Sequence, residues 1–159
     1  MTDVASGATS QGQPANPLDQ TREQVYAGKV YRHVVAFRDD HTDQDKRDAY
    51  KGIVQSLPVL VRTAGLAQAL AFVATRKDDA QKHILIHLDE LLKQDLGGAK
   101  LLDRSRAAPL SEYMYLTRQV MSALLWYKRY AEWLLDKDNA PPPAAAYSAA
   151  GIIIPEGAQ

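Results

Sequence analysis

The chain has 159 residues, of which 46% are hydrophobic and 24% are charged, an ordinary balance for one globular domain. Lys plus Arg and Asp plus Glu both number 19, so bulk charge predicts no polyanionic partner, and a nucleic-acid site would need its cations gathered on one face. The absence of cysteine excludes disulfides, thiol nucleophiles and thiolate metal sites, and it suits a reducing cytoplasm.

The two ends of the chain differ in composition from its middle. Residues 1–17 are rich in Ser, Gly, Gln and Pro and predict a disordered N-terminal tail, which lacks the basic and apolar regions of a signal peptide. Residues 139–159 predict a Pro/Ala/Ile-rich C-terminal tail, in which Gly151–Ile154 is the segment able to dock on the core or on a neighbour. No apolar run approaches the roughly 20 residues needed to span a bilayer. We therefore expect a folded domain over residues 18–138, located in the cytoplasm.

Within this domain the apolar residues recur with the helical period and never alternate with period two. The pattern predicts a first helix over about Arg22–Arg38 and a second from about Asp45, with Thr42 or Asp43 as its N-cap. Pro58 is expected to kink or restart the second helix. Gly65 is expected to close that helix in a left-handed conformation.

Three further helices are predicted after Gly65. They span about Leu66–Thr75, Asp79–Asp95 with a stop at Gly97–Gly98, and Ser111–Lys137, with a polar joint over Asp103–Pro109. Five or six helices with short connections predict a compact, single-domain all-α bundle with a long C-terminal helix.

Catalytic and metal signatures are weak. His83 and His87 stand at i and i+4, but the stretch reads HILIHLDE and supplies neither a third zinc ligand nor the glutamate of H-E-x-x-H. Because both lie at the edge of an apolar stripe, the pattern favours packed, hydrogen-bonded imidazoles over a metalloenzyme. Paired carboxylates fall in turns or on outer helix faces, at Asp39–Asp40, Asp78–Asp79 and Asp89–Glu90. We expect no enzyme activity, no cofactor and no metal.

Cations and aromatic residues share the last predicted helix. At 100° per residue Arg118 and Arg129 lie on its outer face with Lys128 nearby, while Trp126 and Trp133 line its flank, where Arg129 can reach Trp133. Arginine beside aromatic rings suits a phosphate backbone with unstacked bases, and equally a protein contact. A solvated charged face is the third interpretation.

Three more cations lie in or beside apolar segments. Lys29 and Arg32 border the apolar stripe of the first helix. Arg62 stands alone in SLPVLVRTAGLAQALAF, which is otherwise almost wholly apolar. An arginine is rarely buried without a partner, so Arg62 either pairs with a carboxylate inside the bundle or emerges onto a functional face.

Two segments together carry a family resemblance. SLPVLVRTAGLAQALAF and YLTRQVMSALLWYKRYAEWLL resemble the signature blocks of the small helical subunit of type III-B (Cmr) CRISPR RNA-interference effector complexes. The first block matches at Leu57–Pro58, Gly65–Leu66, Gln68 and Ala71–Phe72, and the second at Trp126, Lys128–Arg129 and Ala131. The resemblance covers roughly residues 22–135, and the C-terminal tail extends beyond it.

The resemblance implies a non-catalytic, structural role in antiviral defence. Copies of the subunit would stack head to tail against the backbone and large subunits of the Cmr complex, in which the backbone subunits cut the target, and would contact guide RNA and target RNA without sequence preference. We hypothesise that six cations contribute to one RNA-facing surface: Lys29, Arg32, Arg62, Arg118, Lys128 and Arg129. The alternative is a helical protein–protein adaptor without RNA contact, in which Trp126 and Trp133 form the interface. Neither interpretation involves a membrane.

Overall fold

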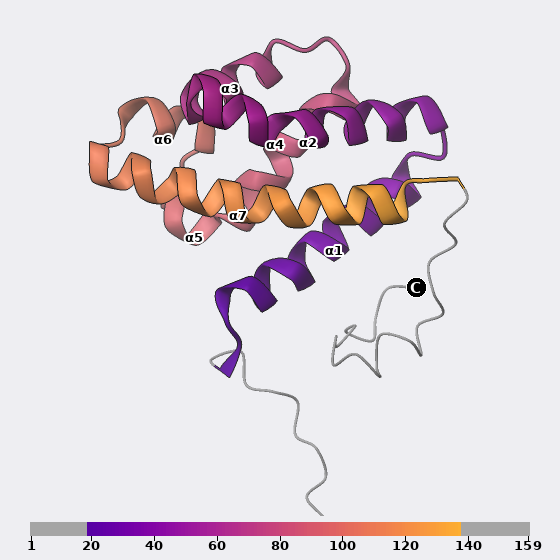
Figure 1. The fold of residues 1–159 in the computed structure, drawn as a ribbon, viewed down its shortest axis with the longest axis horizontal. Coiled ribbons are helices and arrows are strands. Elements are labelled where there is room, and N and C mark those ends of the chain that lie inside the picture. The colour runs from indigo at the N-terminus through magenta and orange to yellow at the C-terminus, as the bar shows by residue number, and fades with distance from the viewer. Residues whose placement is uncertain (1–18, 138–159) are drawn as a thin grey trace, which may run out of the picture.

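A computed structural model describes residues 19–137, and this part of the chain is an all-α bundle (Figure 1). Its helices are α1 (Arg22–Asp40), α2 (Gln44–Ala64), α3 (Leu66–Ala74), α4 (Asp79–Leu91), α5 (Lys93–Leu96), α6 (Leu101–Ala107) and α7 (Leu110–Leu134). The predicted fold class is confirmed, including the long C-terminal helix. The tails predicted at residues 1–17 and 139–159 lie outside the described residues.

Local capping explains where the first two helices begin. Thr21 and Gln24 form a reciprocal capping box, in which each side chain accepts a hydrogen bond from the other's backbone N–H. Asp43, one of the two predicted caps, accepts a hydrogen bond of 3.0 Å from the backbone N–H of Asp45. Both starts thus follow from short polar side chains that satisfy the free N–H groups of a first turn.

The structure corrects the expected restart at Pro58. Helix α2 runs unbroken through this residue, and the Ser56 hydroxyl donates back to the Ile53 carbonyl at 3.1 Å instead of capping a new helix. Proline removes one backbone hydrogen bond from a helix interior. Here that loss is offset because Leu57 and Pro58 are both buried in the core, and a restart would break the face that carries them.

Gly65 separates α2 from α3, as predicted, but its backbone differs from the expected left-handed helical conformation. Its φ of 86° combines with a ψ of 160°, a region that only glycine occupies readily. The Tyr113 hydroxyl also lies 3.0 Å from the point where a Cβ would sit. Both the sharp joint and this close approach depend on the missing side chain.

Two short helices in the second half of the domain were not predicted. Helix α4 ends at Leu91, before the predicted Asp95, and α5 follows it and ends at Gly97 with a left-handed φ of 58°. Helix α6 occupies most of the expected polar joint, and Asp89 accepts a 2.7 Å hydrogen bond from the backbone N–H of Leu101 at its start. Segments of four and seven residues are too short to show a helical period.

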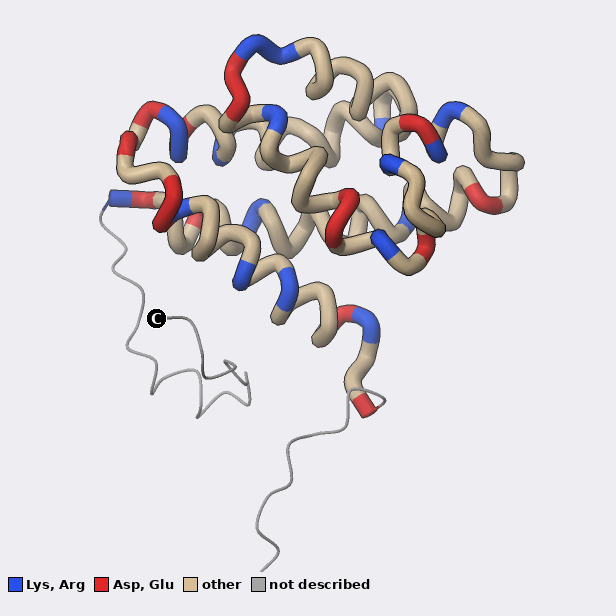
Figure 2. Tube along the Cα trace, turned by 180° about the vertical axis from the view of Figure 1, so that it is seen from behind, with Lys and Arg blue, Asp and Glu red and all other residues tan. Residues whose placement is uncertain are grey.

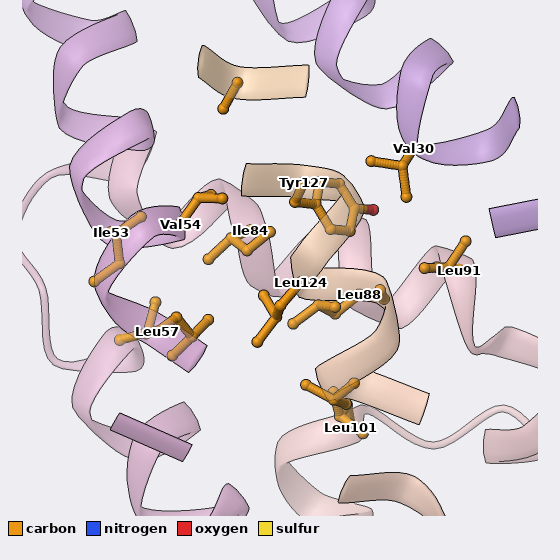
Figure 3. Packing of buried hydrophobic residues seen from close by; sticks show 14 of the residues in the cluster. Val30, Ile53, Val54, Leu57, Ile84, Leu88, Leu91, Leu101, Leu124 and Tyr127 are labelled. Carbon is orange, nitrogen blue, oxygen red and sulfur yellow. The ribbon is translucent and has the colours of Figure 1, made fainter. Parts of the chain in front are cut away.

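Helix α7 supplies much of the core. Figure 3 shows Leu124 and Tyr127 reaching toward Ile84 and Leu88 of α4, with Val54 of α2 close by. The side chains of α7 that are buried recur with the helical period: Leu116, Val120, Ala123, Leu124, Tyr127, Ala131 and Leu134. In the part of the chain that the structure describes, no helix is long and apolar enough to cross a membrane.

Candidate RNA-facing surface

The outer face of α7 carries three of the predicted site residues. Arg118, Lys128 and Arg129 all lie on this helix, and none of them forms an ion pair within residues 19–137. Leu125 lies seven residues after Arg118 and four before Arg129, so these three side chains project from one side of the helix. Exposed apolar side chains accompany the cations, because Leu125 is 48% exposed and Met114 is 52% exposed.

Arg62 lies beside this face. Helix α2 packs along α7 in the opposite direction, since the Gln55 amide donates to Glu132 at 3.2 Å, and the hydroxyl of Tyr113 meets the backbone just beyond the end of α2. Arg62 is two helical turns after Gln55 and therefore shares its side of α2. Arg62 is exposed and makes no ion pair among the described residues. Of its two predicted placements, the structure shows the exposed one. We call Arg62, Arg118, Lys128 and Arg129 the α2–α7 cation group.

Lys29 and Arg32 lie apart from that group, on α1. His33, one turn after Lys29, points toward α4 and places its Nε2 3.3 Å from a Glu90 carboxylate oxygen. Burial lowers the pKa of His33, Glu90 opposes that shift, and the nearby charges of Arg32 and Lys29 lower the pKa further. Tyr31, by contrast, packs on α7. The six predicted cations therefore fall into the α2–α7 group and a pair on α1 that neighbours α4.

Charge as a whole is mixed. Viewed from behind, lysines and arginines are interspersed with aspartates and glutamates along the described helices (Figure 2). Formal neutrality thus comes from short-range mixing of signs, and a cationic face has to arise from local groups such as the one on α2 and α7.

The two tryptophans hold α1 against α7. The Trp126 indole N–H donates to Glu23 at 2.7 Å, and the Trp133 ring centroid lies 6.4 Å from that of Tyr31. Both indoles are partly buried by these contacts. The guanidinium of Arg129 lies 5.8 Å from the centroid of the Trp126 ring. Glu23 was not predicted as the partner of Trp126, because nothing local in the sequence shows that α1 crosses α7 there.

All four histidines of the chain meet between α1 and α4. The His87 ring lies 4.8 Å from that of His33 and 4.7 Å from that of His83, measured between centroids, and its Nδ1 is 2.7 Å from the Tyr50 hydroxyl. His87 is buried and hydrogen-bonded, as the packing interpretation predicts. Within residues 19–137 no three His, Cys, Asp or Glu side chains are grouped to hold a metal ion.

The paired carboxylates have structural partners. Asp78 caps α4 by accepting a 2.9 Å hydrogen bond from the backbone N–H of Ala80, and Asp89 accepts the N–H at the start of α6. Burial raises the pKa of Asp89, and the Leu101 N–H opposes that rise. Asp39 is held by Arg38 at 3.0 Å. One carboxylate of each pair therefore has a structural role. Asp78 and Asp89 accept hydrogen bonds at the starts of helices, and Asp39 forms a surface ion pair.

Comparison with known proteins identifies the family. The family model described as CRISPR-associated protein (Cas_Cmr5) matches residues 22–134, which include all the helices of the described structure. The chain belongs to the CRISPR-associated Cmr5 family. The resemblance inferred from the two sequence blocks is therefore confirmed.

A relative and a solved structure support this membership at a useful level of similarity. The "CRISPR system Cmr subunit Cmr5" of Thermus thermophilus is 40% identical over 119 residues, which are 74% of this chain and 99% of the relative. The crystal structure of a CRISPR-associated Cmr5 family protein from the same organism superposes with a TM-score of 0.63 at 40% identity, covering 74% of this chain and 100% of the other. The Cmr5-family match ends at residue 134, so the C-terminal tail lies beyond it.

Proposed function

We propose that this chain is a non-catalytic structural subunit of a type III-B CRISPR Cmr ribonucleoprotein effector, acting in antiviral defence in the cytoplasm. The observation that carries the proposal is 40% identity to a Cmr complex subunit across 99% of that subunit's length. Such coverage leaves no large part of the relative without a counterpart here. The packed histidines and the structural carboxylates agree with a building block whose chemistry is binding rather than catalysis.

RNA contact is proposed for the α2–α7 cation group. Guanidinium and ammonium groups that carry no ion pair among the described residues are available to neutralise phosphates, and phosphate contacts do not depend on base sequence. Arg129 over Trp126 also adds a planar cation beside a partly exposed ring, where a splayed base can stack. A neutral chain with a few such cations binds RNA weakly on its own. Several copies stacked along one RNA bind it more tightly through multivalency.

Protein contacts are proposed for the apolar positions of the same face. Leu110 is 74% exposed, and it continues the α7 stripe formed by Met114 and Leu125. Exposed aliphatic side chains next to arginines are typical of protein–protein interfaces. We assign this stripe to contacts with backbone or large Cmr subunits or with another copy of the chain. This exposed apolar stripe also favours the alternative function, a protein–protein adaptor without RNA contact.

Purification from the native host distinguishes the two functions. A tagged copy of the chain is expected to recover guide RNA together with large Cmr subunits, and ultraviolet cross-linking is expected to attach that RNA to the tagged chain. Reversal of two charges, Lys128→Glu and Arg129→Glu, should reduce the cross-link while the protein subunits still co-purify. Lys93→Glu, at an exposed position on α5, is the matched control and should leave the cross-link intact.

Two results would count against the proposal in different ways. An eluate that contains partner proteins but no nucleic acid would favour the adaptor. An eluate without any Cmr subunit would show that the chain is not part of the Cmr complex.

A further inference from the structure

A cavity of about 450 Å³ opens between α3, α4 and α6, away from the α2–α7 cation group. Leu85, Ile86 and Leu102 line it with aliphatic surface, and Ile86 is 51% exposed. Lys82 and Lys100 stand among its charged lining residues. The volume lies in the roughly 300–1,000 Å³ range of binding pockets. Neither the proposed RNA contact nor the apolar stripe of α7 uses this site.

We propose that the cavity is the docking site for the chain's own C-terminal segment, Gly151–Ile154, bound within the same molecule. Ile152, Ile153 and Ile154 are the one run of three branched aliphatic residues outside residues 19–137. In an extended backbone, alternate side chains point the same way, so Ile152 and Ile154 enter the cavity together. Pro155 favours that geometry because a residue preceding proline is restricted to extended conformations.

The tail begins at the end of the bundle where α4 starts, and the cavity extends from the start of α4 toward α6 at the other end (Figure 1). Gln44, at the start of α2, donates to the Leu135 carbonyl at 3.1 Å, just beyond the end of α7. Two residues later, Lys46 pairs with Asp78 at 3.2 Å, and Asp79 lines the cavity. The 15 residues from 138 to 152 reach about 50 Å when extended. That exceeds the roughly 37 Å length of α7 itself, so the segment has ample reach.

The charged residues that line the cavity carry both signs: Lys82, Lys100, Asp79 and Asp89. Lys82 is already paired with Asp79 at 2.8 Å, whereas Lys100 forms no ion pair within the described residues. An intramolecular tether also raises the effective concentration of the segment to the millimolar range, so a weak apolar contact suffices.

The experiment uses the full chain and its lack of cysteine. Ala158→Cys gives a single site for a nitroxide spin label, and isotope-labelled protein then reports proximity through broadening of its NMR signals. Signals of Leu85, Ile86 and Leu102 are expected to broaden. The double substitution Ile152→Ser and Ile154→Ser should remove that broadening and speed amide exchange around the cavity by about threefold or more, because polar side chains no longer cover its aliphatic walls. Tyr147→Ser, in the same tail, is the matched control and should change neither.

Three outcomes overturn the proposal. Broadening confined to other surfaces, or absent altogether, would show that the segment does not occupy the cavity. Broadening that persists when spin-labelled chains without isotope are mixed with isotope-labelled chains without the spin label would assign the cavity to a second copy. A Tyr147→Ser variant that changes as much as the isoleucine variant would show that the effect is not specific to Gly151–Ile154.

Discussion

His87 shows how a single side chain links burial to the pH dependence of folding. Burial lowers its pKa to about 2, and the neighbouring charges of His33 and His83 add to the effect. The imidazole is therefore neutral in the folded protein, where its Nδ1 meets the Tyr50 hydroxyl. In the unfolded chain the pKa returns to about 6.5. Below that pH the unfolded state binds more protons, so stability falls as pH decreases.

We expect the wild-type protein to lose about 2 kcal/mol of unfolding free energy between pH 7.5 and pH 5 from His87 alone, as the unfolded imidazole becomes protonated. Burial also lowers the pKa values of His33 and His83, which steepens the loss. Urea unfolding at several pH values measures it. His87→Gln keeps a hydrogen-bonding side chain but cannot titrate, so its pH dependence should be shallower. Equal slopes for both proteins would show that His87 is not buried in neutral form.

At the scale of elements, the α2–α3 joint rests on one glycine. Gly65→Ala would force a side chain into a backbone region that costs about 1–3 kcal/mol for other residues. It would also press the new Cβ against the Tyr113 hydroxyl, 3.0 Å away. We expect a melting temperature lowered by roughly 5–10 °C in a calorimetric scan.

The same substitution at Gly28, Gly28→Ala, is expected to raise the stability of the protein instead of lowering it. Gly28 lies inside α1, and no heavy atom would come within 4 Å of its new Cβ. Alanine should therefore stabilise the helix by about 0.5–1 kcal/mol. If Gly65→Ala were as mild as Gly28→Ala, the joint would not depend on a glycine conformation.

Elements long enough to repeat their pattern were predictable from the sequence. The apolar period located the main helices, and Asp43 marked a start, because caps and stripes are local features. The period is lost in α5 and α6, which are too short to repeat it. The rule that proline interrupts a helix failed at Pro58, since burial of that helix face decides the outcome and burial depends on tertiary neighbours.

At the scale of the whole molecule, the candidate site was predictable only where its residues share one helix. The sequence placed Arg118 and Arg129 on one helix face because a single helix fixes their spacing. It could not show that Arg62 joins them, or that Lys29 lies toward α4, because both facts depend on which helices are neighbours. The separation of the six cations into the α2–α7 cation group and the pair on α1 therefore became visible only in the folded structure.

That division can be tested by the salt dependence of RNA binding. We expect single-stranded RNA of mixed sequence to bind the full chain weakly, with log K falling linearly against log salt concentration, because phosphate neutralisation releases counterions. Lys128→Ala with Arg129→Ala should flatten the slope by roughly one unit for each phosphate that is no longer neutralised. Fluorescence anisotropy across a salt series measures both slopes.

The pair on α1 supplies the comparison that decides how far the RNA-facing surface extends. Lys29 lies one turn from His33, which holds the Glu90 carboxylate beside it, so nearby negative charge offsets part of its attraction for phosphate. Lys29→Ala with Arg32→Ala should therefore change the slope less than the α7 pair does. Equal changes would mean that one strand of RNA crosses both groups, as a single surface requires. If the salt slope of the Lys128→Ala, Arg129→Ala variant were unchanged, Lys128 and Arg129 would not contact RNA.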